Sequence, residues 1–160
     1  MKRLRFEDGD LDRVDAKLLA ALAEDARISV AELARRVGLS PPSVSERLRR
    51  LEESGVIEGY TVRINPAALG LPVAAWLRVR PVPGEMKRVA EILQGLQEIV
   101  ECDRVTGEDC FIARVHVKSM NHLEEVIDAV IPYAMTNTSI VQSSPVEKRL
   151  PAGLGVRPVP

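Results

Sequence analysis

Two helical patterns joined by a very short turn constrain the fold of this chain more than any other feature. The first begins after Ser29, whose hydroxyl can accept from the Glu32 amide while the Glu32 side chain returns the contact. Gly38 supplies the left-handed residue that commonly follows a helix. Ser40 can then cap the next helix, with Pro41 at its first position, where an amide has no intrahelical partner. The sequence therefore predicts a sharp turn between two short helices.

A third helical pattern precedes these two, with Asp12 as its predicted N-cap. Its apolar positions recur at spacings of three and four residues, at Leu11, Val14, Leu18 and Leu22. The other two helices bury Val30, Leu33, Ala34 and Val37, and then Val44, Leu48 and Leu51. Ser43 and Glu46 form a second possible capping box, so a later start of the last helix stays open. Three such helices with a tight turn before the third predict a helix-turn-helix.

Charge is distributed unevenly around this predicted motif. The 160 residues carry a net charge of −1, and residues 1–60 hold 11 Lys and Arg against 12 Asp and Glu. Residues 35–50, however, hold five arginines and one acid. Any affinity for nucleic acid therefore depends on where the arginines lie and not on total charge.

Helical periodicity directs a polar face of the third helix outward. With the apolar stripe inward, Pro42, Glu46, Arg49 and Arg50 project away, with Ser43 and Arg47 on one flank and Ser45 on the other. Arginine can bind guanine edges or phosphates, and hydroxyls and helix-start amides can bind phosphates. The alternative is a helical bundle with a solvated arginine face. The predicted DNA-contacting residues are Arg35, Arg36, Ser40, Pro42, Ser43, Ser45, Glu46, Arg47, Arg49 and Arg50, with base contacts expected at Ser43, Glu46, Arg47 and Arg50.

The rest of the chain changes to a strand-rich pattern. The segment VIEGYTVRI predicts a strand, serving as a wing or hinge, and Pro66 and Gly70 mark a domain boundary. Beyond it the predicted order is strand 71–82, helix 85–96, strands 100–106 and 110–117 around Gly107, a helix capped by Ser119, and strand 139–146. This βαββαβ order predicts a four-stranded antiparallel sheet with both helices on one face. Trp76 on the other face suggests burial against a second copy of the chain.

The expected organisation is therefore an α+β chain. It comprises a mobile arm at 1–10, a helix-turn-helix domain at 11–57, a hinge strand and linker at 58–70, a βαββαβ domain at 71–150 and a flexible tail at 151–160.

Several function classes find no support in the residues. A hairpin turning at Gly107 places Cys102 opposite Ala113 and not beside Cys110, so the cysteines are expected to be small buried side chains and no metal site is predicted. His122 is expected to be exposed at a helix start. No phosphate loop, cofactor motif or catalytic constellation occurs, so we expect no cofactor and no enzyme. No signal peptide or membrane-spanning run is recognised, which predicts a soluble cytoplasmic protein.

Three stretches together resemble one family. They are LDRVDAKLLAALAEDARIS, VAELARRVGLSPPSVSERLRRLEESGVIEGYTVRINPAALG and ECDRVTGEDCFIARV. Over residues 11–150 the chain resembles the Lrp/AsnC (feast/famine) regulators. The resemblance implies a winged helix-turn-helix followed by a ferredoxin-like, RAM-type sandwich that binds amino acids or related metabolites. It also implies dimers formed through the sheets, often assembled into tetramers or octamers, and control of genes of amino-acid metabolism.

The resemblance also implies the place of an effector pocket, at subunit contacts around the hairpin turn. That place corresponds to Gly107, Glu108 and Asp109, with Thr136, Asn137, Thr138 and Ser139, in the loop before the last strand, as the opposite wall. A carboxylate there could receive an ammonium group, while turn amides and hydroxyls could hold a carboxylate. The run Glu108-Asp109-Cys110-Phe111 departs from the acid-aromatic-acid-aromatic pattern commonest in the family, so the pocket's location follows from the resemblance and the ligand does not.

The sequence thus predicts a homo-oligomeric regulator that binds double-stranded DNA and a small amino-acid-like effector. One alternative is a ferredoxin-like small-molecule-binding or catalytic protein whose helical part contacts other proteins. Another is a DNA-compacting architectural protein with weak sequence preference.

Overall fold

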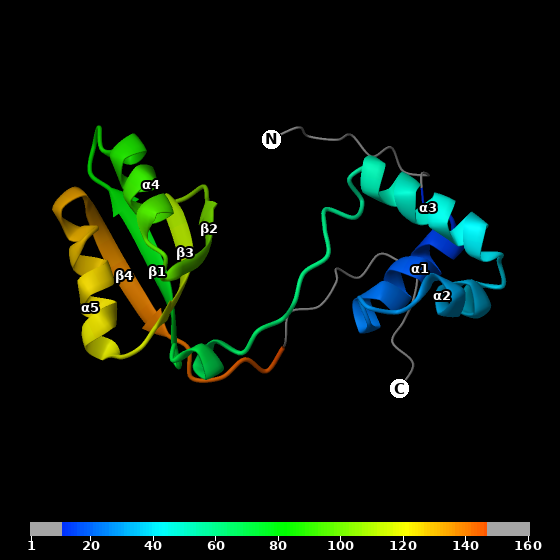
Figure 1. The fold of residues 1–160 in the computed structure, drawn as a ribbon. Helices are drawn as coiled ribbons and strands as arrows, with labels where there is room; N and C mark the ends of the chain where they lie inside the picture. The colour runs from blue at the N-terminus through cyan, green and yellow to red at the C-terminus, as the bar shows by residue number, and fades with distance from the viewer. Residues whose placement is uncertain (1–10, 147–160) are drawn as a thin grey trace. The chain divides into compact units, whose positions relative to one another are not determined.

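A computed structural model describes residues 11–146, which form two compact units, 11–62 and 63–146. The division between them falls inside the segment 58–70 that the sequence marks as a linker. The expected arm at 1–10 and the tail at 151–160 lie outside the described residues. Figure 1 shows the helical first unit and the sheet-containing second unit, each of which is described separately below.

The first unit contains three helices, α1 (Arg13–Glu24), α2 (Val30–Val37) and α3 (Pro41–Glu53). Asp12 caps α1 with its side chain, and Ser29 and Ser40 cap α2 and α3, as the sequence predicts. Gly38 ends α2 with φ 72°, the left-handed conformation that glycine adopts without steric cost. The three helices pack on one apolar cluster, whose fully or nearly buried members are Leu18, Ala21, Leu33, Ala34 and Val44.

The second unit is an antiparallel sheet with two helices. Its elements are a short 3₁₀ helix η1 (Pro66–Leu69), β1 (Val73–Pro81), α4 (Met86–Gly95), β2 (Ile99–Arg104), β3 (Phe111–Val117), α5 (Met120–Asp128), a 3₁₀ turn η2 (Ile131–Tyr133) and β4 (Ala134–Ile140). The strands lie in the order β2-β3-β1-β4, and every pairing is antiparallel. This is the predicted ferredoxin-like arrangement, with β2 and β4 at the edges.

One face of the sheet carries both helices. In β1, Ala75, Leu77 and Val79 are fully buried, and they pack with Val89 of α4 and Val126 of α5 in one core. The alternate residues of β1 belong to the other face, which the described residues leave without a covering helix. Trp76 lies there, opposite Arg114 of β3, whose guanidinium stacks 5.0 Å from the tryptophan ring centroid. The predicted two-layer architecture is confirmed.

Two predicted strands are wrong. The segment VIEGYTVRI forms no strand, because no other described segment pairs with its backbone, and Val62 and Ile64 are 75% and 59% exposed. The last strand is Ala134–Ile140 and not 139–146, since all seven of these residues pair with residues 75–81 of β1. Thr, Asn and Ser side chains made this strand look like a loop, but register with a neighbouring strand, not composition, defines it.

The roles expected of the cysteines and of His122 also need correction. Cys102 does pair with Ala113 across the hairpin, as predicted, but Cys102 is exposed and Cys110 only half-buried. His122 is half-buried, with Nε2 3.0 Å from a Glu98 oxygen. Within residues 11–146, no helix is long and apolar enough to cross a membrane.

Candidate nucleic-acid interface and effector site

The helix α3 presents the polar face that the sequence predicts. Val44 and Leu51 are buried, and Val44 belongs to the apolar cluster of the three helices. The predicted DNA-contacting residues are all exposed except Arg47, which is half-buried. The two capped turns therefore orient α3 with one apolar and one accessible side.

Backbone amides at the start of α3 contribute little to anion binding. Pro41 and Pro42 have no N–H group, and the Ser43 amide already donates to the Ser40 hydroxyl. The two serine hydroxyls also lie 2.8 Å apart. The expected phosphate contact by helix-start amides is therefore unavailable in the first three positions, and hydroxyls and arginines remain as donors.

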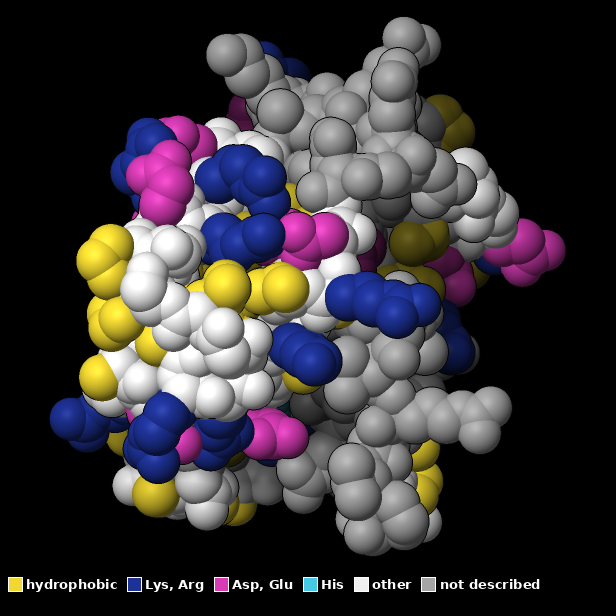
Figure 2. Space-filling view, turned by 90° about the vertical axis from the view of Figure 1, so that its right-hand side faces the viewer, with side chains coloured by type: hydrophobic (Ala, Val, Ile, Leu, Met, Phe, Trp, Pro, Cys, Tyr) yellow, Lys and Arg dark blue, Asp and Glu magenta, His cyan; other side chains and the backbone are white. Residues whose placement is uncertain are grey.

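Exposed arginines near α3 form ion pairs with neighbouring acids. Arg49 donates to Glu46 and Glu53 on its own helix, and this contact lowers the pKa of the Glu46 carboxyl. On α2, Arg35 pairs with Glu32, and Arg36 pairs with Glu32 and with Glu24 of α1, both at 3.3 Å. Figure 2 shows basic and acidic side chains interspersed on one face of the molecule. The surface is a mixed-charge one, in agreement with the net charge of −1.

Two arginines of α3 are held by a carboxylate of α1. Asp15, fully buried, accepts from Arg47 Nη1 at 2.8 Å through Oδ1 and from Arg50 Nη2 at 2.7 Å through Oδ2. Arg47 Nη1 also lies 2.6 Å from Asp12 Oδ2. The hydrogen bonds to both acids raise the pKa of Arg47, and a backbone hydrogen bond from Asp15 together with Arg47 lowers the pKa of Asp12. This cluster joins α1 to α3.

Sequence reasoning missed this acidic partner. Asp15 lies on the apolar stripe of its helix, three residues before Leu18 and four after Leu11. A charged residue at a buried position is almost always paired with an opposite charge. An acid within the apolar stripe is therefore the signal that could have predicted an arginine partner for Asp15.

The hairpin turn of the second unit brings one arginine to a predicted effector residue. Gly107 has φ 116°, and a Cβ added there would meet nothing within 4 Å. Arg80 of β1 donates to the Glu108 carbonyl through Nε at 2.8 Å and to its carboxylate through Nη2 at 2.7 Å. Asp109 makes no ion pair with another residue of the described range 11–146. Of the two candidate carboxylates, Asp109 is therefore the one that keeps its binding capacity.

The opposite wall expected for the effector pocket lies within β4 and not in a loop. Thr136 and Thr138 pair with Val79 and Leu77, so they belong to the face that carries the helices. Asn137 and Ser139 pair with Arg78 and Trp76 on the uncovered face, and both are exposed. These four residues cannot all line one pocket, because successive side chains of a strand point to opposite faces.

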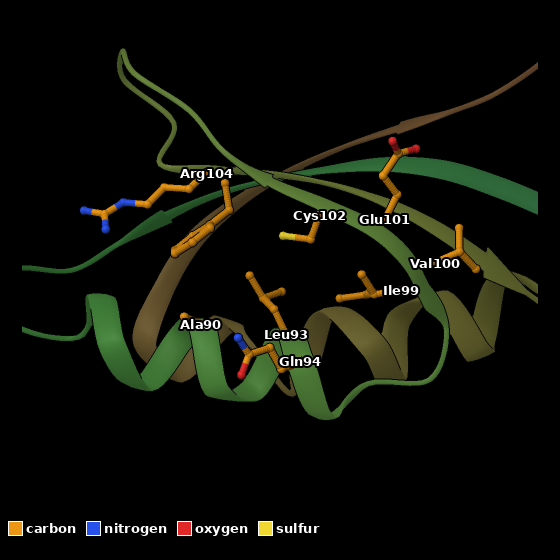
Figure 3. Close-up of a pocket in the computed structure, with 9 residues that line it drawn as sticks. Ala90, Leu93, Gln94, Ile99, Val100, Glu101, Cys102 and Arg104 are labelled. Atoms are coloured by element: carbon orange, nitrogen blue, oxygen red, sulfur yellow. The ribbon is translucent and has the colours of Figure 1, made fainter. Parts of the chain in front are cut away.

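A groove of about 370 Å³ lies elsewhere, between α4 and the edge strand β2. Figure 3 shows Leu93, Ile99 and Cys102 pointing toward it and the Glu101 carboxylate pointing away. None of the predicted effector residues lines it. No cluster of three His, Cys, Asp or Glu side chains that could hold a metal occurs among residues 11–146.

Comparisons with known proteins agree with this architecture. A model described as winged helix-turn-helix DNA-binding matches residues 11–58, and one described as the Lrp/AsnC ligand binding domain matches residues 74–151. The HTH-type transcriptional regulator LrpC of Bacillus subtilis is 35% identical over 133 residues, which cover 83% of this chain and 92% of LrpC.

The chain belongs to the Lrp/AsnC family of transcriptional regulators.

Other members extend this likeness. The leucine-responsive regulatory protein of Escherichia coli is 37% identical over 121 residues, 74% of each chain. The structure of B. subtilis LrpC aligns with a TM-score of 0.83 at 34% identity over 87% of this chain and 99% of that one. A feast or famine regulatory protein from Mycobacterium tuberculosis, complexed with L-methionine, aligns with a TM-score of 0.82 at 33% identity over 89% and 99%. For this Lrp/AsnC protein, the helix-turn-helix unit is thus the DNA-binding part.

Proposed function

We propose that this protein is a cytoplasmic, homo-oligomeric regulator, without catalytic activity, that reads DNA with α3 and changes its DNA affinity when a small amino-acid-like effector binds. The observation that supports DNA reading most is the accessible polar face of α3. Ser43, Glu46 and Arg50 are exposed on it while Val44 and Leu51 anchor the helix. A helix held in this way can enter a major groove, and two copies would read half-sites about 34 Å apart.

The geometry divides the predicted DNA contacts into two groups. Arg47 is 27% exposed and bonded to two acids, so we assign it to holding α3 in place. The other nine residues stay candidate DNA contacts: Pro42, Ser43, Ser45, Glu46, Arg49 and Arg50 for the groove, and Arg35, Arg36 and Ser40 for the phosphates flanking it.

The effector proposal rests on Asp109 and the turn at Gly107. Asp109 is a carboxylate without an ion-pair partner among the described residues, and it could bind the ammonium group of an amino acid. The M. tuberculosis relative complexed with L-methionine supports a ligand of this class. Because Asn137 and Ser139 lie on the uncovered face of the sheet, a pocket completed by a second subunit would use them and not Thr136 or Thr138.

The DNA-binding test uses a 30-base-pair duplex enriched by the protein from a randomised library, and a scrambled duplex of the same composition. Wild-type protein should prefer the enriched duplex by at least a hundredfold, and its affinity should fall steeply with salt. Arg50→Ala should weaken binding to the enriched duplex without changing oligomer size. Equal binding of both duplexes would favour an architectural protein, and no binding at low salt a ferredoxin-like protein without DNA function.

The effector test screens the twenty amino acids by calorimetry against the full chain. Asp109→Asn should weaken binding of the amino acid found at least tenfold, whereas Glu108→Gln should change it little because Arg80 already occupies that carboxylate. Gly107→Val should abolish the effector response and retain DNA binding, because valine is strained at φ 116°. An unaltered response in the Asp109 and Gly107 variants would refute this pocket.

A further inference from the structure

Asp15 is the only charged residue among residues 11–146 that is completely buried, and its location within α1 puts it behind the recognition helix. A buried carboxylate is costly unless its lone pairs are used. Both of its oxygens are bonded, one to Arg47, the other to Arg50 and to the Asp12 amide. Because the acid is fully buried, it does not itself contact DNA, and its effect on DNA must act through the two arginines.

Arg47 and Arg50 differ in how many of their N–H donors remain available to bind DNA. Arg47 is 27% exposed and places one nitrogen between two carboxylates, so it acts as a link between helices. Arg50 is 57% exposed, and its contact with Asp15 uses Nη2 alone. Nε, Nη1 and the second hydrogen of Nη2 have no hydrogen-bond partner within residues 11–146, so a parallel pair of N–H donors remains available.

We propose that Asp15 is a positioning residue for DNA recognition, which fixes the guanidinium of Arg50 on α3 before DNA is bound. This inference rests on the proposed reading of DNA by α3. A guanine edge is recognised by two parallel N–H donors of one guanidinium, so the plane of that group must be set correctly. An arginine that is already oriented loses less conformational freedom on binding.

The support that Asp15 provides is rigid, unlike that of the neighbouring Arg49. Asp15 is fully buried within the three-helix core, whereas Glu46 and Glu53, the partners of Arg49, are exposed and on the same helix. A group held by a buried side chain keeps its geometry better than one held by mobile surface side chains. Arg49 is therefore the natural control for Arg50.

The experiment compares Asp15→Asn with wild-type protein on the enriched and the scrambled duplex. Asparagine keeps the shape of the side chain but provides one acceptor oxygen instead of two. We expect affinity for the enriched duplex to fall at least tenfold, while affinity for the scrambled duplex stays equal or rises, because a negative charge has been removed near the DNA-binding face. Equal losses on both duplexes, or no loss on either, would overturn the inference.

A double-mutant cycle then separates positioning from folding. In an Arg50→Ala background, Asp15→Asn should cause no further loss on the enriched duplex, yet it should still lower the melting temperature because Arg47 loses one of its two charged partners. In an Arg49→Ala background the tenfold loss should persist. A full additional loss in the Arg50→Ala background would show that Asp15 acts only on the fold.

A second variant tests the idea if Asp15→Asn does not fold. Arg50→Lys keeps the charge on an exposed residue but removes the planar fork that Asp15 orients. It should bind the scrambled duplex like wild type and the enriched duplex at least tenfold more weakly. Arg49→Lys should cause a smaller loss on the enriched duplex, because exposed acids of its own helix hold Arg49. Wild-type binding by Arg50→Lys would overturn the inference. Failure of wild-type protein to enrich any duplex would instead contradict the proposed function itself.

Discussion

The contact between Arg47 and the two acids of α1 shows how single side chains determine where α3 lies. Asp12 begins α1 as its N-cap and also accepts from Arg47, so one residue starts a helix and holds a neighbouring one. Asp15 continues the same contact into the core. These bonds span more than thirty positions in the sequence, and the local patterns of α1 and α3 give no direct indication of them.

Removal of Arg47 should therefore destabilise the first unit. We expect Arg47→Ala to lower the free energy of unfolding by about 2 kcal/mol, between the values typical of exposed and of buried ion pairs, since a buried carboxylate loses one partner. Arg49→Ala is the matched control and should have little effect, because its pairs are exposed. Denaturant titration followed by circular dichroism measures both. Equal effects of the two changes would contradict the structural role of Arg47.

The free energy of unfolding at low pH should depend on Asp12. Folding lowers the pKa of this carboxyl from its ordinary value of 3.8, so its contribution is present above pH 3.8 and is lost as the pH falls through the lower pKa of the folded state. Asp12→Asn keeps a capping side chain but cannot titrate. We expect its unfolding free energy to vary less with pH below 3.8 than that of wild type, as measured by urea titrations at several pH values. Parallel pH profiles would contradict this assignment.

At the scale of elements, the turn between α2 and α3 and the register of the strands position the two candidate sites. Gly38 allows α2 to end at Val37 and α3 to begin at Pro41, and the first unit then exposes the polar face of α3. In the second unit, pairing of β1 with β3 and β4 brings Arg80 to the hairpin turn. Each site thus depends on a connection and on a pairing partner.

A substitution at Gly38 should test the turn. Because Gly38 has φ 72° and open space around it, Gly38→Ala introduces backbone strain without a clash and should cost about 1 kcal/mol of stability. Gly95 is the control, since it ends α4 without a positive φ and also has open space, so Gly95→Ala should be neutral or slightly stabilising. Thermal unfolding of both variants measures the difference. A neutral Gly38→Ala would mean that the turn tolerates another conformation.

At the scale of the whole molecule, each unit leaves a surface that another subunit could cover. The face of the sheet that bears Trp76 has no helix over it among the described residues, and Tyr60, Val62 and Ile64 expose apolar side chains in an unpaired extended segment. Apolar surface that no other element covers is typical of association surfaces. Self-association would remove them from water.

The single tryptophan of the chain provides a direct measurement of that association. If two sheets pack through the uncovered face, dilution should shift the emission of Trp76 to longer wavelength as the dimer dissociates. Trp76→Ala should weaken association at least tenfold in sedimentation experiments, whereas Val100→Ala, at an exposed position of the edge strand β2, should leave it unchanged. Emission that does not change with dilution while sedimentation shows dissociation would place the interface elsewhere.

Much of this protein follows from local chemistry along the chain. Caps at Asp12, Ser29 and Ser40 and the left-handed Gly38 fix where the helices begin and end, because each satisfies backbone groups within a few residues. Alternation along β1 identified the buried and uncovered faces, and the hairpin at Gly107 correctly paired Cys102 with Ala113.

Long-range contacts account for the rest. The polar run Thr136–Ser139 is a strand because β1 lies beside it and pairs with it. The segment VIEGYTVRI has a strand-like sequence but is unpaired, because no described strand lies beside it. The pairing of Arg47 and Arg50 with Asp15, and of Arg80 with Glu108, likewise depends on which elements the fold brings together. Helix caps are satisfied by nearby residues, whereas strand pairing and buried charge pairs need a partner from a distant part of the chain, and only the folded chain supplies it.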